Sequence, residues 1–177
     1  MYVSKVRRRC MKHHWIEAEL NNLAKLISVI DRHLSDICMK SVEAEDPDSF
    51  GLFDSAEHAT GLGLATCQTY MATAYGNFGI EKRRALELGP KHRGGLTKVQ
   101  IISHAANYWK HNNEWALDRS AARREAIERA FETVGFPVGT DYPLSGVLAE
   151  LVSPRSASLQ EVISILEIWK TELYKCI

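Results

Sequence analysis

The sequence contains few cysteines, and their spacing matches no known motif. Cys10, Cys38, Cys67 and Cys176 include no C-x-x-C pair, so neither a structural zinc site nor a disulfide framework is indicated. We therefore expect reduced thiols and a cytoplasmic location. No metal or other cofactor is expected.

Long apolar runs and an excess of charge of one sign are also missing. No stretch approaches the roughly 20 apolar residues that a membrane-spanning helix needs, and Glu17 and Glu19 follow the basic N-terminal segment too soon for a signal peptide. The 22 Lys and Arg residues are balanced by 22 Asp and Glu residues. We expect no membrane contact, and any nucleic acid would have to be bound locally.

No segment alternates apolar and polar residues with the period of two that marks a β-strand, so no sheet is expected. Apolar residues instead recur at steps of three and four, and 177 residues with 45% hydrophobic content are sufficient for one core. The pattern predicts an all-α, single-domain helical bundle of about five to six helices over 13–177, preceded by a basic N-terminal tail, 1–12. The helices are expected at 13–39, 54–75, 98–112, 120–134, 144–152 and from 158 onward, with a short additional helix at 80–88.

Three segments have the form of a capping box, in which a short polar side chain and a Glu or Gln three residues later bind free backbone amides. These are 54–57, 97–100 and 158–161, and each predicts the start of a helix. Gly61 and Gly63 lie inside the second long helix, where glycine costs stability unless another helix packs closely. We therefore expect this helix to be central.

The helix expected at 98–112 carries the best candidate for chemistry. His104, Asn107 and His111 are spaced by three and four residues, which places them on one helical stripe, with Lys110 and Glu114 beside it. Imidazole, amide and ammonium groups together suit proton transfer and stabilisation of an anionic phosphate without a metal. The two histidines are seven residues apart, whereas paired metal ligands on one helix usually lie three or four apart, so a metal site is not expected.

Two further features could contact a nucleic acid. The basic loop that contains His92 and Arg93 directly precedes a helix N-terminus, where backbone amides favour anions. Tyr108 could stack on a base. The loop lacks the glycine and lysine pattern of a phosphate-binding P-loop, so we expect at most a phosphate contact there.

Each of these residues also has an ordinary structural interpretation. His111 could be a surface histidine bonded to Glu114, and His104 could be structural. Asn107 could bond to a neighbouring helix. Tyr108 could belong to the core.

The segment Ala106-Asn107-Tyr108-Trp109-Lys110-His111 within a helical chain resembles the HEPN superfamily, named for its occurrence in higher eukaryotes and prokaryotes. Catalytic members carry an arginine, frequently followed by asparagine, and a histidine four to six residues later. Aligned on Asn107 and His111, the arginine position is Ala106. The sequence therefore departs from the family pattern at the residue that stabilises the charged transition state.

The resemblance implies a HEPN-like fold and metal-independent endoribonuclease activity, often in antiphage defence or a toxin–antitoxin pair. It further implies two motifs meeting across a homodimer, with catalytic roles for His111 and Asn107. Lys110 or Arg93 would then supply the missing positive charge, although lysine lacks the planar fork of arginine. RNA binding without cleavage is a second interpretation of the same resemblance. A non-catalytic interaction protein that homodimerises or docks a protein partner is the alternative from another functional class.

Overall fold

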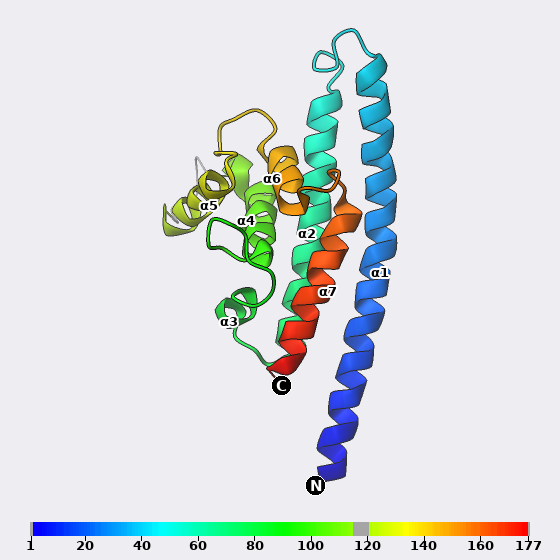
Figure 1. Ribbon diagram of the computed structural model, residues 1–177, viewed down its shortest axis with the longest axis vertical. Helices are drawn as coiled ribbons and strands as arrows, with labels where there is room; N and C mark the ends of the chain where they lie inside the picture. The colour runs from blue at the N-terminus through cyan, green and yellow to red at the C-terminus, as the bar shows by residue number, and fades with distance from the viewer. Residues whose placement is uncertain (1, 115–120, 177) are drawn as a thin grey trace.

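The computed structural model describes residues 2–114 and 121–176, and most of these residues are helical (Figure 1). Its elements are α1 (Tyr2–Glu43), α2 (Leu52–Phe78), α3 (Lys82–Leu86), α4 (Lys98–His111), a 3-10 turn (Asn112–Glu114), α5 (Ala121–Val134), α6 (Pro143–Val152) and α7 (Leu159–Lys175). The described ranges contain no β-strand, only two isolated β-bridges. The all-α helical bundle predicted from the sequence is confirmed.

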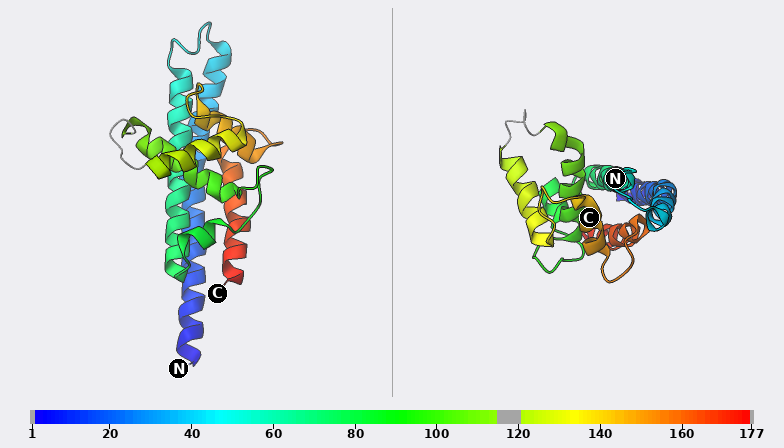
Figure 2. Two further views of the ribbon diagram at one scale, coloured as in Figure 1. Left: turned by 90° about the vertical axis from the view of Figure 1, so that its left-hand side faces the viewer. Right: turned by 90° about the horizontal axis from the view of Figure 1, so that it is seen from above.

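Helix α2 lies at the centre of this arrangement. It contacts α1, α3, α4, α6 and α7. The long helices α1, α2 and α7 run side by side, while α3 to α6 gather on the side of α2 away from α1 (Figures 1 and 2). One cluster of buried apolar side chains joins these helices and includes Leu64, Met71, Phe131 and Trp169.

Two of the three glycines in α2, Gly61 and Gly63, lie where other helices approach it closely. A Cβ atom added to Gly61 would lie 1.9 Å from Cδ1 of Trp109 in α4, and one added to Gly63 would lie 2.4 Å from Cδ1 of Leu159 in α7. These separations are about half of a normal contact between carbon atoms. The predicted central position of α2 is thereby confirmed. Gly61 allows the close approach of α4, and Gly63 allows that of α7.

Helix α1 begins at Tyr2, eleven residues before the predicted start. The basic segment expected as a tail is therefore continuous with the first long helix, and its N-terminal end extends beyond the other helices in Figure 1. Among the described residues, no helix combines the length and the apolar character required to cross a membrane.

Two carboxylates on the N-terminal helices cap the start of later helices. Glu57 of α2 accepts hydrogen bonds from the backbone N–H groups of Leu144 and Ser145, at 2.6 and 2.8 Å, where α6 begins. Asp31 of α1 accepts one from the backbone N–H of Leu159, at 2.7 Å, where α7 begins. Both arrangements satisfy amides that a helix cannot satisfy internally.

The predicted capping box at 54–57 is wrong. Helix α2 begins at Leu52, after Gly51 in the left-handed conformation (φ 64°), and no side chain caps it. Because Glu57 lies a full turn inside the helix, its carboxylate is free to reach α6. The box at 97–100 is confirmed, with both reciprocal bonds present. Ser158 caps α7 as predicted, but Glu161 pairs with Arg155.

Candidate functional site

Gln68 of α2 connects the candidate stripe of α4 to the centre of the protein. Its Nε2 donates to the carbonyl oxygen of Ser103 at 3.0 Å, to Oγ of Ser103 at 3.2 Å and to Oδ1 of Asn107 at 3.0 Å. Its Oε1 accepts a hydrogen bond from Nζ of Lys110. One amide side chain thus holds three residues of α4.

The orientation of the Gln68 and Asn107 amides follows from hydrogen-bond partners that can only donate or only accept. The Ser103 carbonyl can only accept and the Lys110 ammonium can only donate, so Nε2 of Gln68 must face Ser103 and Oε1 must face Lys110. Asn107 must then present Oδ1 to Gln68. Among the described residues no acceptor is found for Nδ2 of Asn107, which is left as an available donor.

A pocket of about 520 Å³ lies beside this network, between α2, α3 and α4. Its polar lining includes Gln68, Lys82, Ser103, Asn107 and Lys110, and its described lining residues include no carboxylate. Within the described part of the chain, neither Lys82 nor Lys110 forms an ion pair with Asp or Glu. The pocket is therefore positively charged in a chain whose net charge is zero.

Burial, and secondarily the charge of Lys82, lower the pKa of Lys110 below its ordinary value of 10.5. Burial is also the main cause of the lowered pKa of His104, and Lys82 again contributes. His104 is half-buried on α4 next to Ser103 but does not line the pocket. These shifts show that Lys82 acts electrostatically on the candidate stripe, and an anion in the pocket would oppose both of its effects.

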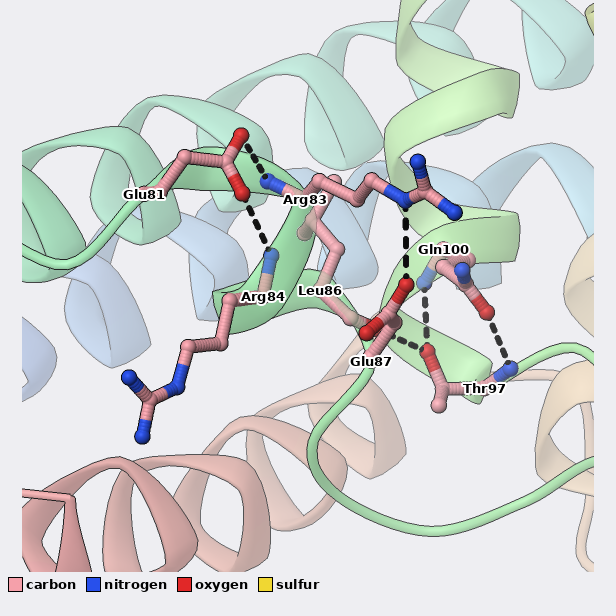
Figure 3. Close-up of polar contacts among 7 residues, drawn as sticks. All are labelled: Glu81, Arg83, Arg84, Leu86, Glu87, Thr97 and Gln100. Carbon is pink, nitrogen blue, oxygen red and sulfur yellow. Dashed lines mark hydrogen bonds and ion pairs between the residues drawn. The ribbon is translucent and has the colours of Figure 1, made fainter.

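Hydrogen bonds hold both ends of α3, the helix that carries Lys82 (Figure 3). The Glu81 carboxylate caps its first turn by accepting from the backbone N–H groups of Arg83 and Arg84, at 2.8 and 3.0 Å. The hydroxyl of Thr97, the N-cap residue of α4, donates to the carbonyl oxygen of Leu86 at the other end of α3. Both ends of this five-residue helix are thus fixed, one of them directly to α4.

No protein-family model, curated protein or solved structure matches this chain. Function is therefore inferred from the residues of the site itself.

Two of the predicted catalytic residues, Asn107 and Lys110, meet at Gln68. His111, on the same helix, lies outside the pocket lining, and its Nδ1 is 3.4 Å from Oε2 of Glu114. This contact is the one expected of a surface histidine, but it leaves Nε2 without a partner among the described residues. The structure separates the stripe into a pocket-facing part and an exposed end.

The remaining predicted residues lie elsewhere. His92 and Arg93 both bind Oε1 of Glu150 in α6, at 3.0 and 2.8 Å. The backbone N–H of Gly94 donates to Nδ1 of His92 at 3.2 Å. His92 therefore bonds to its own loop through one ring nitrogen and to α6 through the other, and so holds the loop against α6 near the N-terminal end of α4. Tyr108 packs on Phe131 with a ring separation of 5.0 Å, as expected of a core residue.

The sequence interpretation missed Gln68, Lys82 and Ser103. Gln68 interrupts the apolar face of α2 between Cys67 and Met71, which is a usable signal for a buried polar contact. Lys82 has no comparable signal, because only the packing of α3 brings it to the pocket. In the described part of the chain, no group of three or more His, Cys, Asp or Glu side chains is placed to hold a metal ion.

Proposed function

We propose that this chain is a HEPN-like protein that binds RNA, with a phosphate held in the pocket between α2, α3 and α4. The observation that carries the proposal is the pairing of Lys82 and Lys110 in one pocket without a lining carboxylate among the described residues. Ammonium groups attract phosphate, and the Nδ2 of Asn107 adds a directed hydrogen-bond donor. The antiphage or toxin–antitoxin setting belongs to the same proposal and comes from the family resemblance.

Cleavage, in this proposal, uses His111 and needs no metal ion. His111 follows Lys110 in the chain, its Nδ1 faces Glu114 and its Nε2 is available for proton transfer. Lys110 supplies the positive charge that the family places at the position of Ala106. Because a lysine gives no bidentate contact, we expect cleavage to be slower than with an arginine at that position.

The test measures RNA binding and RNA cleavage separately. Binding of an internally labelled single-stranded RNA is followed by fluorescence anisotropy for the wild type, the double variant Lys82→Gln/Lys110→Gln, and the control Lys25→Gln, which removes an exposed lysine of α1. Cleavage of a mixed RNA pool is followed in EDTA for the wild type and His111→Ala.

We expect the double variant to lose most of its binding and Lys25→Gln to retain it. We expect His111→Ala to bind RNA but not to cut it. Equal binding by the double variant and the control would exclude the pocket as the RNA site. Binding by the wild type without cleavage would leave an RNA-binding protein that is not a ribonuclease.

A specific observation favours a second candidate, a non-catalytic protein that self-associates. Leu26 and Val29 of α1 are 58% and 56% exposed, and Leu62 of α2 is 43% exposed. Val29 and Leu62 also line a shallow groove between these two helices. The engagement of Asn107 by Gln68 likewise fits a structural role for the α4 stripe.

Light scattering after size exclusion tests this candidate. The second candidate predicts a dimer for the wild type and a monomer for Leu26→Lys/Val29→Lys. A wild-type monomer at micromolar concentration would exclude self-association through this face.

A further inference from the structure

Hydrogen-bond donors predominate among the charged and amide groups that line the pocket between α2, α3 and α4. Lys82 and Lys110 carry ammonium groups, and Asn107 directs its Nδ2 away from Gln68 because its Oδ1 is occupied. The hydroxyl of Ser103 accepts from Gln68 and keeps its own proton for donation. Thr69 and Thr73 at the rim donate to carbonyl oxygens of their own helix, so toward the pocket their hydroxyl oxygens can act only as weak acceptors.

Gln68 fixes this polarity. Its Nε2 donates to the carbonyl oxygen of Ser103 and its Oε1 accepts from Lys110. A flipped amide would lose both bonds, because the carbonyl can only accept and the ammonium can only donate. The pocket therefore favours a ligand that is rich in hydrogen-bond acceptors and negatively charged. Two lysines would repel a cation, and a donor-rich ligand could bond only to hydroxyl oxygens, which are weak acceptors.

Two lysines give the pocket its positive charge. Lys82 and Lys110 come from different helices, and the described residues provide neither with a carboxylate partner. Lys82 contributes to lowering the pKa of Lys110, as expected when two ammonium groups repel each other. A ligand with two negative charges removes this repulsion more completely than a ligand with one.

We propose that the pocket recognises a phosphate monoester, presented as the terminal phosphate of an RNA strand, an inference that rests on the proposed RNA binding. A monoester carries about −1.5 to −2 at neutral pH, whereas each internal diester carries one negative charge. The volume of about 520 Å³ lies within the usual range for a small-ligand site. The protein thus engages RNA at an end.

The test compares RNA ends on one strand. An internally labelled 12-residue single-stranded RNA is prepared with a 5′-phosphate, with a 3′-phosphate, or with hydroxyl groups at both ends, and affinities are measured at constant salt. We expect one phosphorylated end to bind about tenfold tighter than the hydroxyl-ended RNA. Lys110→Gln and, independently, Lys82→Gln should reduce this ratio to about one, while Lys25→Gln should preserve it.

The outcomes separate this inference from the proposed function. Equal affinity for all three RNAs would overturn terminal recognition and leave RNA binding intact. If no RNA binds, titration with inorganic phosphate and with adenosine 5′-monophosphate decides the pocket chemistry. Binding that depends on Lys110 would support a free monoester as the ligand and reject RNA, whereas no binding of either compound would overturn the phosphate site as well.

Discussion

Gly61→Ala tests the packing that holds α4 against α2, and with it the site. The new methyl group would lie 1.9 Å from Cδ1, 2.3 Å from Cγ and 2.6 Å from Nε1 of Trp109. Carbon atoms in contact need about 3.5–4.0 Å, so the indole ring or α4 must move by roughly 2 Å. Overpacking of this kind costs about 1–3 kcal/mol. Replacing glycine by alanine inside a helix regains about 1 kcal/mol, which leaves a net loss of up to about 2 kcal/mol.

Gly76→Ala is the matched control in the same helix. A Cβ atom at Gly76 meets nothing within 4 Å, so only the gain in helix propensity remains, and this variant should be stabilised by up to about 1 kcal/mol. Urea denaturation followed by circular dichroism gives both free energies of unfolding. Because both variants gain the same helix propensity, they should differ by the overpacking cost of about 1–3 kcal/mol, with Gly61→Ala the less stable. Equal stability would refute the close approach of Trp109 to α2 and the placement of Asn107 that depends on it.

Three further predictions concern groups outside the pocket lining. Because the pKa of His104 is lowered by burial, the unfolded chain binds its proton at higher pH than the folded chain, so stability should fall as the pH drops through about 6.5. His104→Gln should make this fall shallower in denaturation measured at pH 5–7.5, and an unchanged slope would contradict it. Burial raises the pKa of the Cys67 thiol to about 12, so iodoacetamide should modify exposed Cys38 in the native protein and spare Cys67, as peptide mass spectrometry can show. Glu57→Gln should reduce stability by about 1–2 kcal/mol through the loss of a charged cap, while Glu45→Gln, at an exposed position, should have little effect; equal losses would refute the cap.

The helical pattern was predictable because it depends on local chemistry. The periodicity of apolar residues predicts each long helix, and the capping box formed by Thr97 and Gln100 predicts the start of α4. The start of α2 was not predictable in the same way. Asp54 and Glu57 fit a capping box by type and spacing, but the left-handed Gly51 ends the preceding turn and lets the helix begin earlier.

The site was predictable only in part, for a physical reason. Spacing along one helix places Asn107 and Lys110 on the same stripe, and the structure brings both to Gln68. Spacing cannot show which neighbouring helix meets the stripe or which end of it remains exposed. Lys82 reaches the pocket because α3 packs on α2 and is bonded to Thr97 at the start of α4. Arg93 is drawn to Glu150 of α6. Both are tertiary effects.

The carboxylates of Asp31 and Glu57 have a consequence for the order of assembly. Each lies on one of the first two helices, yet each completes the first turn of a helix that is synthesised about 90 to 130 residues later. Residues that emerge first from a ribosome can form the α1–α2 hairpin in advance, and this hairpin then provides the anchoring points for α6 and α7. A circular permutant that moves the hairpin to the C-terminus would reverse this order. The permutant is designed to keep the native contacts, but we expect it to fold more slowly during synthesis and to aggregate more than the chain in its natural order.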